Sequence, residues 1–269
     1  MRDWCKFLKS NNFLVGLSID GTQYTHDFYR HDKNGATTFD RIKKQLSLCQ
    51  NIVLNTILLT VVNDKVASNI LEIYSYYKEN GWNYQQYIAC LDPLDEKRGE
   101  KKYALRQEQY GKFLIQLFNL WYEDWEKNEQ PYIRQFDNYI AILLGYQPES
   151  CEQRGTCGIQ NVVEADGSVF PCDFYMTDDY YIGNYNYDQT ETIDEKRREI
   201  GFVARSTNIS DECRECKFIK ICRNGCQRCR DKDDITGKYR NYFCESYKMF
   251  FDECLDKMEY IASYIAKKN

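Results

Sequence analysis

Eight cysteines in the second half of the chain constrain its fold more than any other feature. Four of them form the phrase Cys-x2-Cys-x5-Cys-x3-Cys, one more follows downstream, and a Cys-x9-Gly-x4-Cys phrase stands upstream. Thiolates are soft ligands, and four of them saturate the iron sites of one cubane. Eight thiolates therefore suffice for two fully ligated iron–sulfur clusters. In chain order they are Cys151, Cys157, Cys172, Cys213, Cys216, Cys222, Cys226 and Cys244.

The rest of the composition is that of a globular protein. The 269 residues are 43% hydrophobic and 29% charged, with a net charge of -5, which does not suggest a nucleic-acid partner. No apolar run reaches the length of a signal peptide or a membrane span. We therefore expect a cytoplasmic, reducing location without a membrane partner. There, Cys-x2-Cys arrays more often bind metal than form disulfides, and thirteen cysteines fit a disulfide framework poorly.

The spacing alone does not separate iron from zinc, since Cys-x2-Cys phrases serve both. The two histidines, His26 and His31, lie far from the cysteines in sequence, so a Cys/His zinc site is not expected. An all-thiolate pair of zinc sites stays open, whereas the Gly-x4-Cys phrase and the eightfold count favour iron–sulfur. The remaining cysteines are expected to be small buried hydrophobic residues: Cys5, Cys49, Cys90, Cys229 and Cys254.

The first part of the chain alternates apolar strands with amphipathic helices. The predicted elements are strands at 13–20, 51–63 and 84–92 and helices at 37–49, 65–80 and 106–127. The strand at 51–63 is apolar on both faces, as a covered parallel strand should be. This order predicts a parallel sheet with right-handed crossovers. Three such units are too few to close a barrel.

From about residue 131 the pattern changes. Turn residues and charges cluster near 130–150, so we expect domains at 1–130 and 131–269. Asp166-Gly167, between two alternating runs, predicts a hairpin. Further helices are predicted at 132–145, 191–206 and 245–267.

The cysteine pattern, together with the phrase GLSIDG, resembles the radical S-adenosylmethionine enzymes that carry a SPASM domain. Within that group, the phrases NFLVGLSIDG, CLDPLDEK, VVEADGSVFPCDFY and CRNGCQRCRD resemble the anaerobic sulfatase-maturating enzymes. The resemblance covers essentially the whole chain. It implies an α/β fold, the C-terminal half of a partial (β/α)6 radical SAM barrel followed by a cysteine-rich SPASM domain.

The resemblance implies oxidation of a Cys or Ser of a sulfatase polypeptide to Cα-formylglycine. A 4Fe–4S cluster would cleave S-adenosylmethionine, two auxiliary 4Fe–4S clusters would accept the electron, and a small electron-transfer protein would be a partner. By position, the cluster nearer the active site would be held by Cys151, Cys157, Cys172 and Cys226. The outer cluster would be held by Cys213, Cys216, Cys222 and Cys244. Spacing alone leaves Cys229 as a rival to Cys226.

The resemblance also gives roles to five other residues. Asp173, directly after a cluster thiolate, would be the general base for the substrate proton, the alternative being a turn cap. Ser18 and Asp20 end the first strand, where parallel barrels carry active sites, and would contact the cofactor's ribose or amino-acid portion. Arg30 would bind its carboxylate. An ordinary turn and a surface charge are the alternatives. Leu91 would pack on the adenine, with a plain core leucine as the alternative.

The sequence departs from the family because it contains no Cys-x3-Cys-x2-Cys phrase. At roughly 30 residues per strand–helix unit, we expect on the order of a hundred residues of barrel to be missing, with a missing N-terminal half as a partner. We hypothesise that this chain alone does not generate the 5′-deoxyadenosyl radical. Catalytic release of 5′-deoxyadenosine in an anaerobic assay would overturn that hypothesis. Alternative functions are a non-catalytic iron–sulfur module, another SPASM peptide-modifying enzyme and a zinc-stapled peptide-binding domain.

Overall fold

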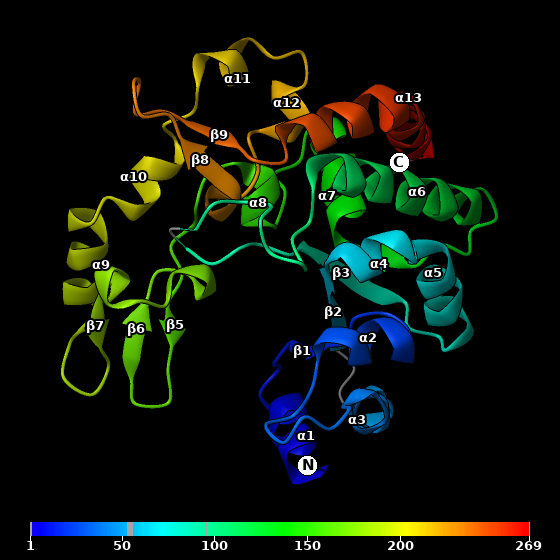
Figure 1. Cartoon of the computed structure of the whole chain (residues 1–269), viewed down its shortest axis with the longest axis horizontal. Coiled ribbons are helices and arrows are strands. Elements are labelled where there is room, and N and C mark those ends of the chain that lie inside the picture. Colours follow the sequence, from blue (N-terminus) through cyan, green and yellow to red (C-terminus); the bar gives the residue numbers. More distant parts are fainter. Residues whose placement is uncertain (1, 53–55, 95, 269) are drawn as a thin grey trace. The chain divides into compact units, whose positions relative to one another are not determined.

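The structure is a computed structural model that describes residues 2–52, 56–94 and 96–268 (Figure 1). It forms two compact units. The first, here called the sheet unit, comprises Met1–Leu144 and Glu245–Asn269, and the second, the cysteine unit, comprises Gly145–Cys244. Among the described residues, no helix combines the length and the apolar character needed to cross a membrane.

The sheet unit is built on four parallel strands in the order of the chain. They are β1 (Val15–Ser18), β2 (Thr56–Val62), β3 (Tyr84–Ala89) and β4 (Tyr132–Ile133). In register, Leu17 lies opposite Leu58 and Leu58 opposite Gln85. The apolar runs predicted the three longer strands and their parallel sheet. The strand predicted at 51–63 begins at Thr56, because the chain up to Ile52 is helical, and positions 53–55 of that prediction lie outside the described residues. The apolar runs did not predict β4, because two residues are too few to show a period.

Eight helices of the described chain belong to this unit in whole or in large part. They are α1 (Arg2–Ser10), α2 (Gln23–Tyr29), α3 (Phe39–Ile52), α4 (Asp64–Ser68), α5 (Ile70–Glu79), α6 (Gln107–Glu126), α7 (Arg134–Leu143) and α13 (Cys244–Lys268). The helix predicted at 65–80 is divided into α4 and α5 at Asn69. The Asn63 side chain caps α4 by accepting from the backbone N–H groups of Lys65 and Val66.

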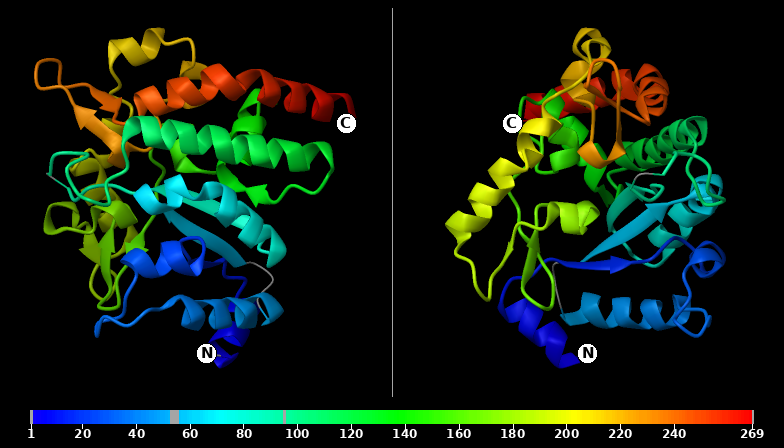
Figure 2. Two further views of the ribbon diagram at one scale, coloured as in Figure 1. Left: turned by 45° about the vertical axis from the view of Figure 1, so that its right-hand side comes forward. Right: turned by 60° about the vertical axis from the view of Figure 1, so that its left-hand side comes forward.

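Aromatic side chains of α6, α7 and α13 form much of the sheet unit's core. The ring of Phe118 lies 5.2 Å from that of Phe136 and 5.9 Å from that of Phe250, and Figure 2 shows α13 running alongside α6. This packing places residues 131–144 and the C-terminal helix with the parallel sheet. The observed division therefore differs from the boundary predicted at 130/131, because aromatic burial unites segments that are distant in sequence.

The cysteine unit has short, irregular elements. Its strands form two antiparallel sheets, β5 (Val162–Val163), β6 (Ser168–Phe170) and β7 (Gly183–Asn184) in one and β8 (Arg230–Lys232) and β9 (Tyr239–Asn241) in the other. Its helices are α8 (Cys151–Arg154), α9 (Thr190–Glu199), α10 (Phe202–Ser206), α11 (Asp211–Glu215) and α12 (Ile219–Cys222), with single turns η1 (Asp173–Tyr175), η2 (Asp178–Tyr180) and η3 (Gln227–Cys229).

The hairpin predicted at Asp166-Gly167 is confirmed, since β5 pairs with β6 across it. Gly167 has φ +87°, and a Cβ there would lie 2.4 Å from the side-chain nitrogen of Asn186. Only glycine meets both demands without strain. The helix predicted at 191–206 is interrupted at Gly201, which adopts a left-handed φ of +63° and separates α9 from α10.

Candidate functional site

Four cysteines of the cysteine unit influence one another electrostatically. The pKa of the Cys157 thiol is raised to about 11, first by burial and then by the charges of Cys226 and Cys151. Burial also raises the pKa of Cys172 far above its usual value, and the charges of Asp173 and Cys226 act in the same direction. The thiols of Cys151, Cys157, Cys172 and Cys226 thus lie close enough to influence one another, and Cys229, the rival ligand, hydrogen-bonds to Cys226. We call Cys151, Cys157, Cys172 and Cys226 the first thiol group.

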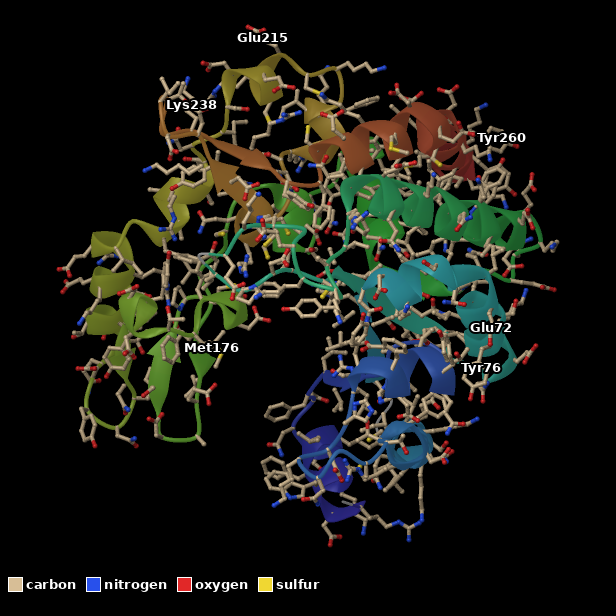
Figure 3. The ribbon with its side chains drawn as sticks, viewed as in Figure 1. Glu72, Tyr76, Met176, Glu215, Lys238 and Tyr260 are labelled. Carbon is tan, nitrogen blue, oxygen red and sulfur yellow. The ribbon has the colours of Figure 1, made fainter. Side chains whose placement is uncertain are left out.

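The other four cysteines are gathered in the same way. The pKa of Cys222 is raised to about 12, first by burial and then by the charges of Cys244, Cys213 and Cys216. Lys238, labelled in Figure 3, forms a salt bridge at 2.6 Å with Asp211 of α11, the helix that carries Cys213. We call Cys213, Cys216, Cys222 and Cys244 the second thiol group.

A left-handed turn separates the two groups at the tightest part of the cysteine array. Arg223, Asn224 and Gly225 have φ values of +50°, +65° and +57°, respectively. Asn and Gly tolerate this region best, and the Asn224 side-chain oxygen is held by the backbone N–H of Asn241 at 2.8 Å. The turn lies between Cys222 and Cys226 and ends the helix α12 that carries Cys222. Neighbours in sequence can therefore belong to different groups, which spacing alone does not reveal.

A close backbone contact packs the loop after α8 against this turn. Gly155 has φ +69°, and a Cβ there would lie 2.0 Å from the carbonyl oxygen of Arg223. No side chain fits such a gap, so glycine is needed on steric and conformational grounds. Because Gly155 lies between Cys151 and Cys157, the contact brings the loop that carries these thiols to the turn that precedes Cys226.

No disulfide joins any of the thirteen cysteines, all of which lie in the described ranges. Within those ranges, no three or more His, Cys, Asp or Glu side chains converge tightly enough to hold a metal ion.

One buried cation in the cysteine unit lacks a counter-charge. Arg230 is 6% exposed, and it pairs with no carboxylate of the described chain. Burying an uncompensated charge is costly. Its guanidinium donates only to the backbone carbonyl oxygens of Gly155, Ser206, Asn224 and Gly225.

A buried amide beside the first thiol group lacks hydrogen-bond partners. Gln227 directly follows Cys226 and is 4% exposed, yet neither its oxygen nor its nitrogen makes a hydrogen bond within the described chain. Buried polar groups without partners are rare and often lie against an ion or a water. A sulfur-rich anionic group held by thiolates would supply acceptors for Gln227 and negative charge for Arg230. The residues present fit such a group.

Asp173 is exposed at the start of η1, beside the first thiol group. Its carboxylate oxygen lies 3.3 Å from the Cys172 sulfur, with the thiol as donor. Among the described residues, this is the hydrogen bond that the Asp173 side chain makes. An exposed carboxylate at this point can accept a proton from a molecule in solution.

Of the four residues predicted at the carboxyl edge of the sheet, Asp20 and Arg30 are in direct contact. Arg30 forms a forked pair with the buried Asp20, with Nε 2.5 Å from Oδ2 and Nη2 3.3 Å from Oδ1, while the Val61 N–H also donates to Oδ1. Asp20 is thus occupied in orienting Arg30, which is not a detached surface charge. Ser18 at the end of β1 and Leu91 just after β3 are each half-buried.

Sequence reasoning missed a histidine that fixes this edge. His26 is 1% exposed, and its Nδ1 accepts from the backbone N–H of Asp20 at 3.1 Å. Nε2 must then carry the proton of the neutral ring and donate to Thr38 at 3.0 Å. Burial lowers the pKa of His26, in keeping with a neutral ring. Its position six residues after Asp20 in the loop after the first strand was the available signal.

Comparisons with known proteins identify related iron–sulfur enzymes. A family profile described as SPASM, an iron–sulfur cluster-binding domain, matches residues 154–217. The cysteine-type anaerobic sulfatase-maturating enzyme of Clostridium perfringens strain 13 is 39% identical over 262 residues, covering 97% of this chain and 71% of that enzyme. The serine-type enzyme of Bacteroides thetaiotaomicron is 28% identical over 275 residues, covering 96% and 66%. A solved structure, native anSMEcpe with bound AdoMet and Cp18Cys peptide, matches with a TM-score of 0.91 at 39% identity, covering 98% of this chain and 73% of that one.

Proposed function

Because this chain belongs to the anaerobic sulfatase-maturating enzymes, a family of radical SAM oxidoreductases, we propose that it takes part in oxidising a sulfatase cysteine to Cα-formylglycine. The choice of cysteine over serine is supported by identity, which is 39% to a cysteine-type relative and 28% to a serine-type one. The substrate is a sulfatase polypeptide, and the protein acts in a reducing compartment.

We assign one auxiliary 4Fe–4S cluster to each thiol group. The electrostatic grouping of the thiols and the compensation that Arg230 and Gln227 require support this assignment. When bound, such clusters accept the electron that leaves the substrate during oxidation. In this assignment Cys222 and Cys226, on either side of the left-handed turn at 223–225, belong to different clusters.

Asp173 is proposed as the base for the substrate proton. Its carboxylate is exposed and lies beside Cys172, so a peptide thiol presented to the first thiol group can reach it. A general base must lie within hydrogen-bond reach of the proton that it accepts. Replacing Asp173 by Asn keeps the shape and removes this capacity.

At the sheet edge, Arg30 is proposed to bind the carboxylate of S-adenosylmethionine. Asp20 holds two of its nitrogens, and Nη1 makes no hydrogen bond within the described residues. The guanidinium is therefore held in one orientation, and its Nη1 is available to donate to a ligand carboxylate. Ser18 and Leu91 are proposed to lie against the ribose or amino-acid portion and the adenine, respectively.

The observation that carries this proposal is the division of eight thiols into two groups, and metal analysis tests it. We expect the anaerobically reconstituted chain to bind about eight iron and eight sulfide per polypeptide. Cys226→Ala should lose about half of both, whereas the matched control Cys229→Ala should keep them. A chain that takes up zinc but no sulfide, or a Cys229→Ala variant that loses half while Cys226→Ala loses none, would contradict the assignment.

A further inference from the structure

Arg230 begins β8, four residues after Cys226, and its guanidinium is fixed by backbone oxygens from three separate segments. The donor–acceptor distances are 3.0 Å from Nε to Asn224, 2.5 Å from Nη1 to Ser206, and 2.8 and 2.6 Å from Nη2 to Gly155 and Gly225. These four hydrogen bonds hold the guanidinium group in one buried position. The position of the positive charge is therefore built into the fold.

The segments that hold Arg230 are those that carry the first thiol group. Asn224 and Gly225 directly precede Cys226, and Gly155 lies between Cys151 and Cys157. Ser206 accepts the backbone N–H of Cys157 at 2.9 Å through its side-chain oxygen. The guanidinium therefore hydrogen-bonds both to the loop between Cys151 and Cys157 and to the two residues that precede Cys226.

Arg230 also acts on the second thiol group. The Asn224 side-chain oxygen lies 3.6 Å from the Cys213 sulfur, and the Asn224 carbonyl accepts from Arg230. Burial lowers the pKa of the guanidinium, while the charges of Cys157, Cys226, Cys229 and Cys213 act in the opposite direction. One buried cation is thus coupled to thiols of both groups.

We propose that Arg230 is a positioning residue that raises the reduction potential of the auxiliary clusters, and that it does so through its buried charge. The proposal rests on the function proposed above. A thiolate-ligated cluster becomes more negative when it gains an electron, and a fixed cation in a low dielectric stabilises that reduced form. No described carboxylate neutralises the cation. The clusters therefore accept the substrate's electron more readily than they would in a neutral cavity.

Potentiometric titration followed by electron paramagnetic resonance tests the proposal on the anaerobically reconstituted chain. Arg230→Gln removes the charge, Arg230→Lys keeps the charge without the fork, and Lys232→Gln removes an exposed charge from the same strand. At a fixed potential, we expect the reduced-to-oxidised ratio of at least one cluster to fall about tenfold in Arg230→Gln, which is 59 mV for one electron. Arg230→Lys and Lys232→Gln should stay near the unaltered protein.

Each outcome bears on the proposal. If Arg230→Gln keeps its iron and sulfide but shows an unchanged potential, the inference is wrong. If it loses the clusters, Arg230→Lys decides, since a loaded Lys variant with the normal potential supports the role of charge. An Arg230→Lys variant that binds no cluster, or binds clusters with a lowered reduction potential, shows that the Arg230 guanidinium only supports the local structure. Either result overturns the inference. If the unaltered chain binds no sulfide, the proposed function itself fails.

Discussion

The two units of this chain are each stabilised by a different kind of interaction. The sheet unit buries large apolar side chains in a parallel sheet with helices, whereas the cysteine unit has strands of two or three residues, and its described apolar clusters include that of Val169, Ile182 and Ile193. Short strand pairs are marginal on their own. The comparison indicates that the sheet unit is stabilised by hydrophobic burial, while the cysteine unit depends on what its thiols bind.

The polar interior of the cysteine unit makes the same point. Arg197, Asn224, Gln227, Arg230 and Asn241 are each less than 9% exposed there. The sheet unit also buries polar groups, some of them paired, as in the contact of Tyr74 with Asp124 at 2.9 Å, and some with an oxygen that makes no hydrogen bond within the described chain, as in Asp137. Buried polar groups specify a structure only when their partners are present. In the cysteine unit, part of that partnership is expected from a bound group.

The largest expected effect comes from breaking a thiol group. Cys222→Ala should lower amide-exchange protection around the second thiol group, at residues 208–244, by an amount on the order of 5 kcal/mol and leave that of β2 and β3 intact, because cluster binding contributes folding free energy there. Hydrogen exchange read by mass spectrometry measures both units in one sample. Cys254→Ala, a buried thiol of α13, is the matched control and should keep the iron. Equal loss of protection in both units would contradict the distinction.

A smaller effect should follow from a cavity in the other unit. Phe250 is fully buried among the rings of Phe118 and Phe136. Phe250→Ala should lower the free energy of unfolding of the sheet unit by about 3–5 kcal/mol, with iron and sulfide content unchanged. Denaturant melts followed by tryptophan fluorescence, together with metal analysis, check both statements. Tyr260→Ala, at a 56% exposed position on α13 (Figure 3), should change stability by less than about 0.5 kcal/mol.

The smallest expected effect is a pH-dependent one in the sheet unit. Burial raises the pKa of Asp137 on α7 to about 6, against opposing backbone hydrogen bonds, and one carboxylate oxygen makes no hydrogen bond within the described chain. The folded state therefore binds a proton more tightly than the unfolded state, so stability falls as the pH rises from about 4 to 6. Asp137→Asn should raise the free energy of unfolding by about 1–2 kcal/mol at pH 8 and by less at pH 5.

Denaturant melts at the two pH values measure this difference. An increment that is the same at pH 5 and pH 8 would show that the ionised carboxylate is not what costs stability. Because the effect arises in α7, it should appear whether or not the cysteine unit is loaded with iron.

Much of the sheet unit could be predicted from the sequence, since apolar runs and helical periods report local burial. The strand at 51–63 was identifiable because both of its faces are apolar, and β2 is correspondingly buried. The division between the units was not, because α13 joins the sheet unit through contacts such as Phe250 with Phe118, which lie far apart in sequence. Local patterns carry no information about such partners.

For the candidate site, the sequence by itself determined the eight thiols, their number being enough for two clusters, and the position of Asp173 beside one of them. Only the tertiary structure decided how Cys222 and Cys226 are parted by a left-handed turn, and that Arg230 lies buried with a carbonyl of Gly155, 75 residues away, as a partner. A sequence gives the types of side chain that can bind a metal, whereas burial and charge compensation arise only when distant segments fold against one another.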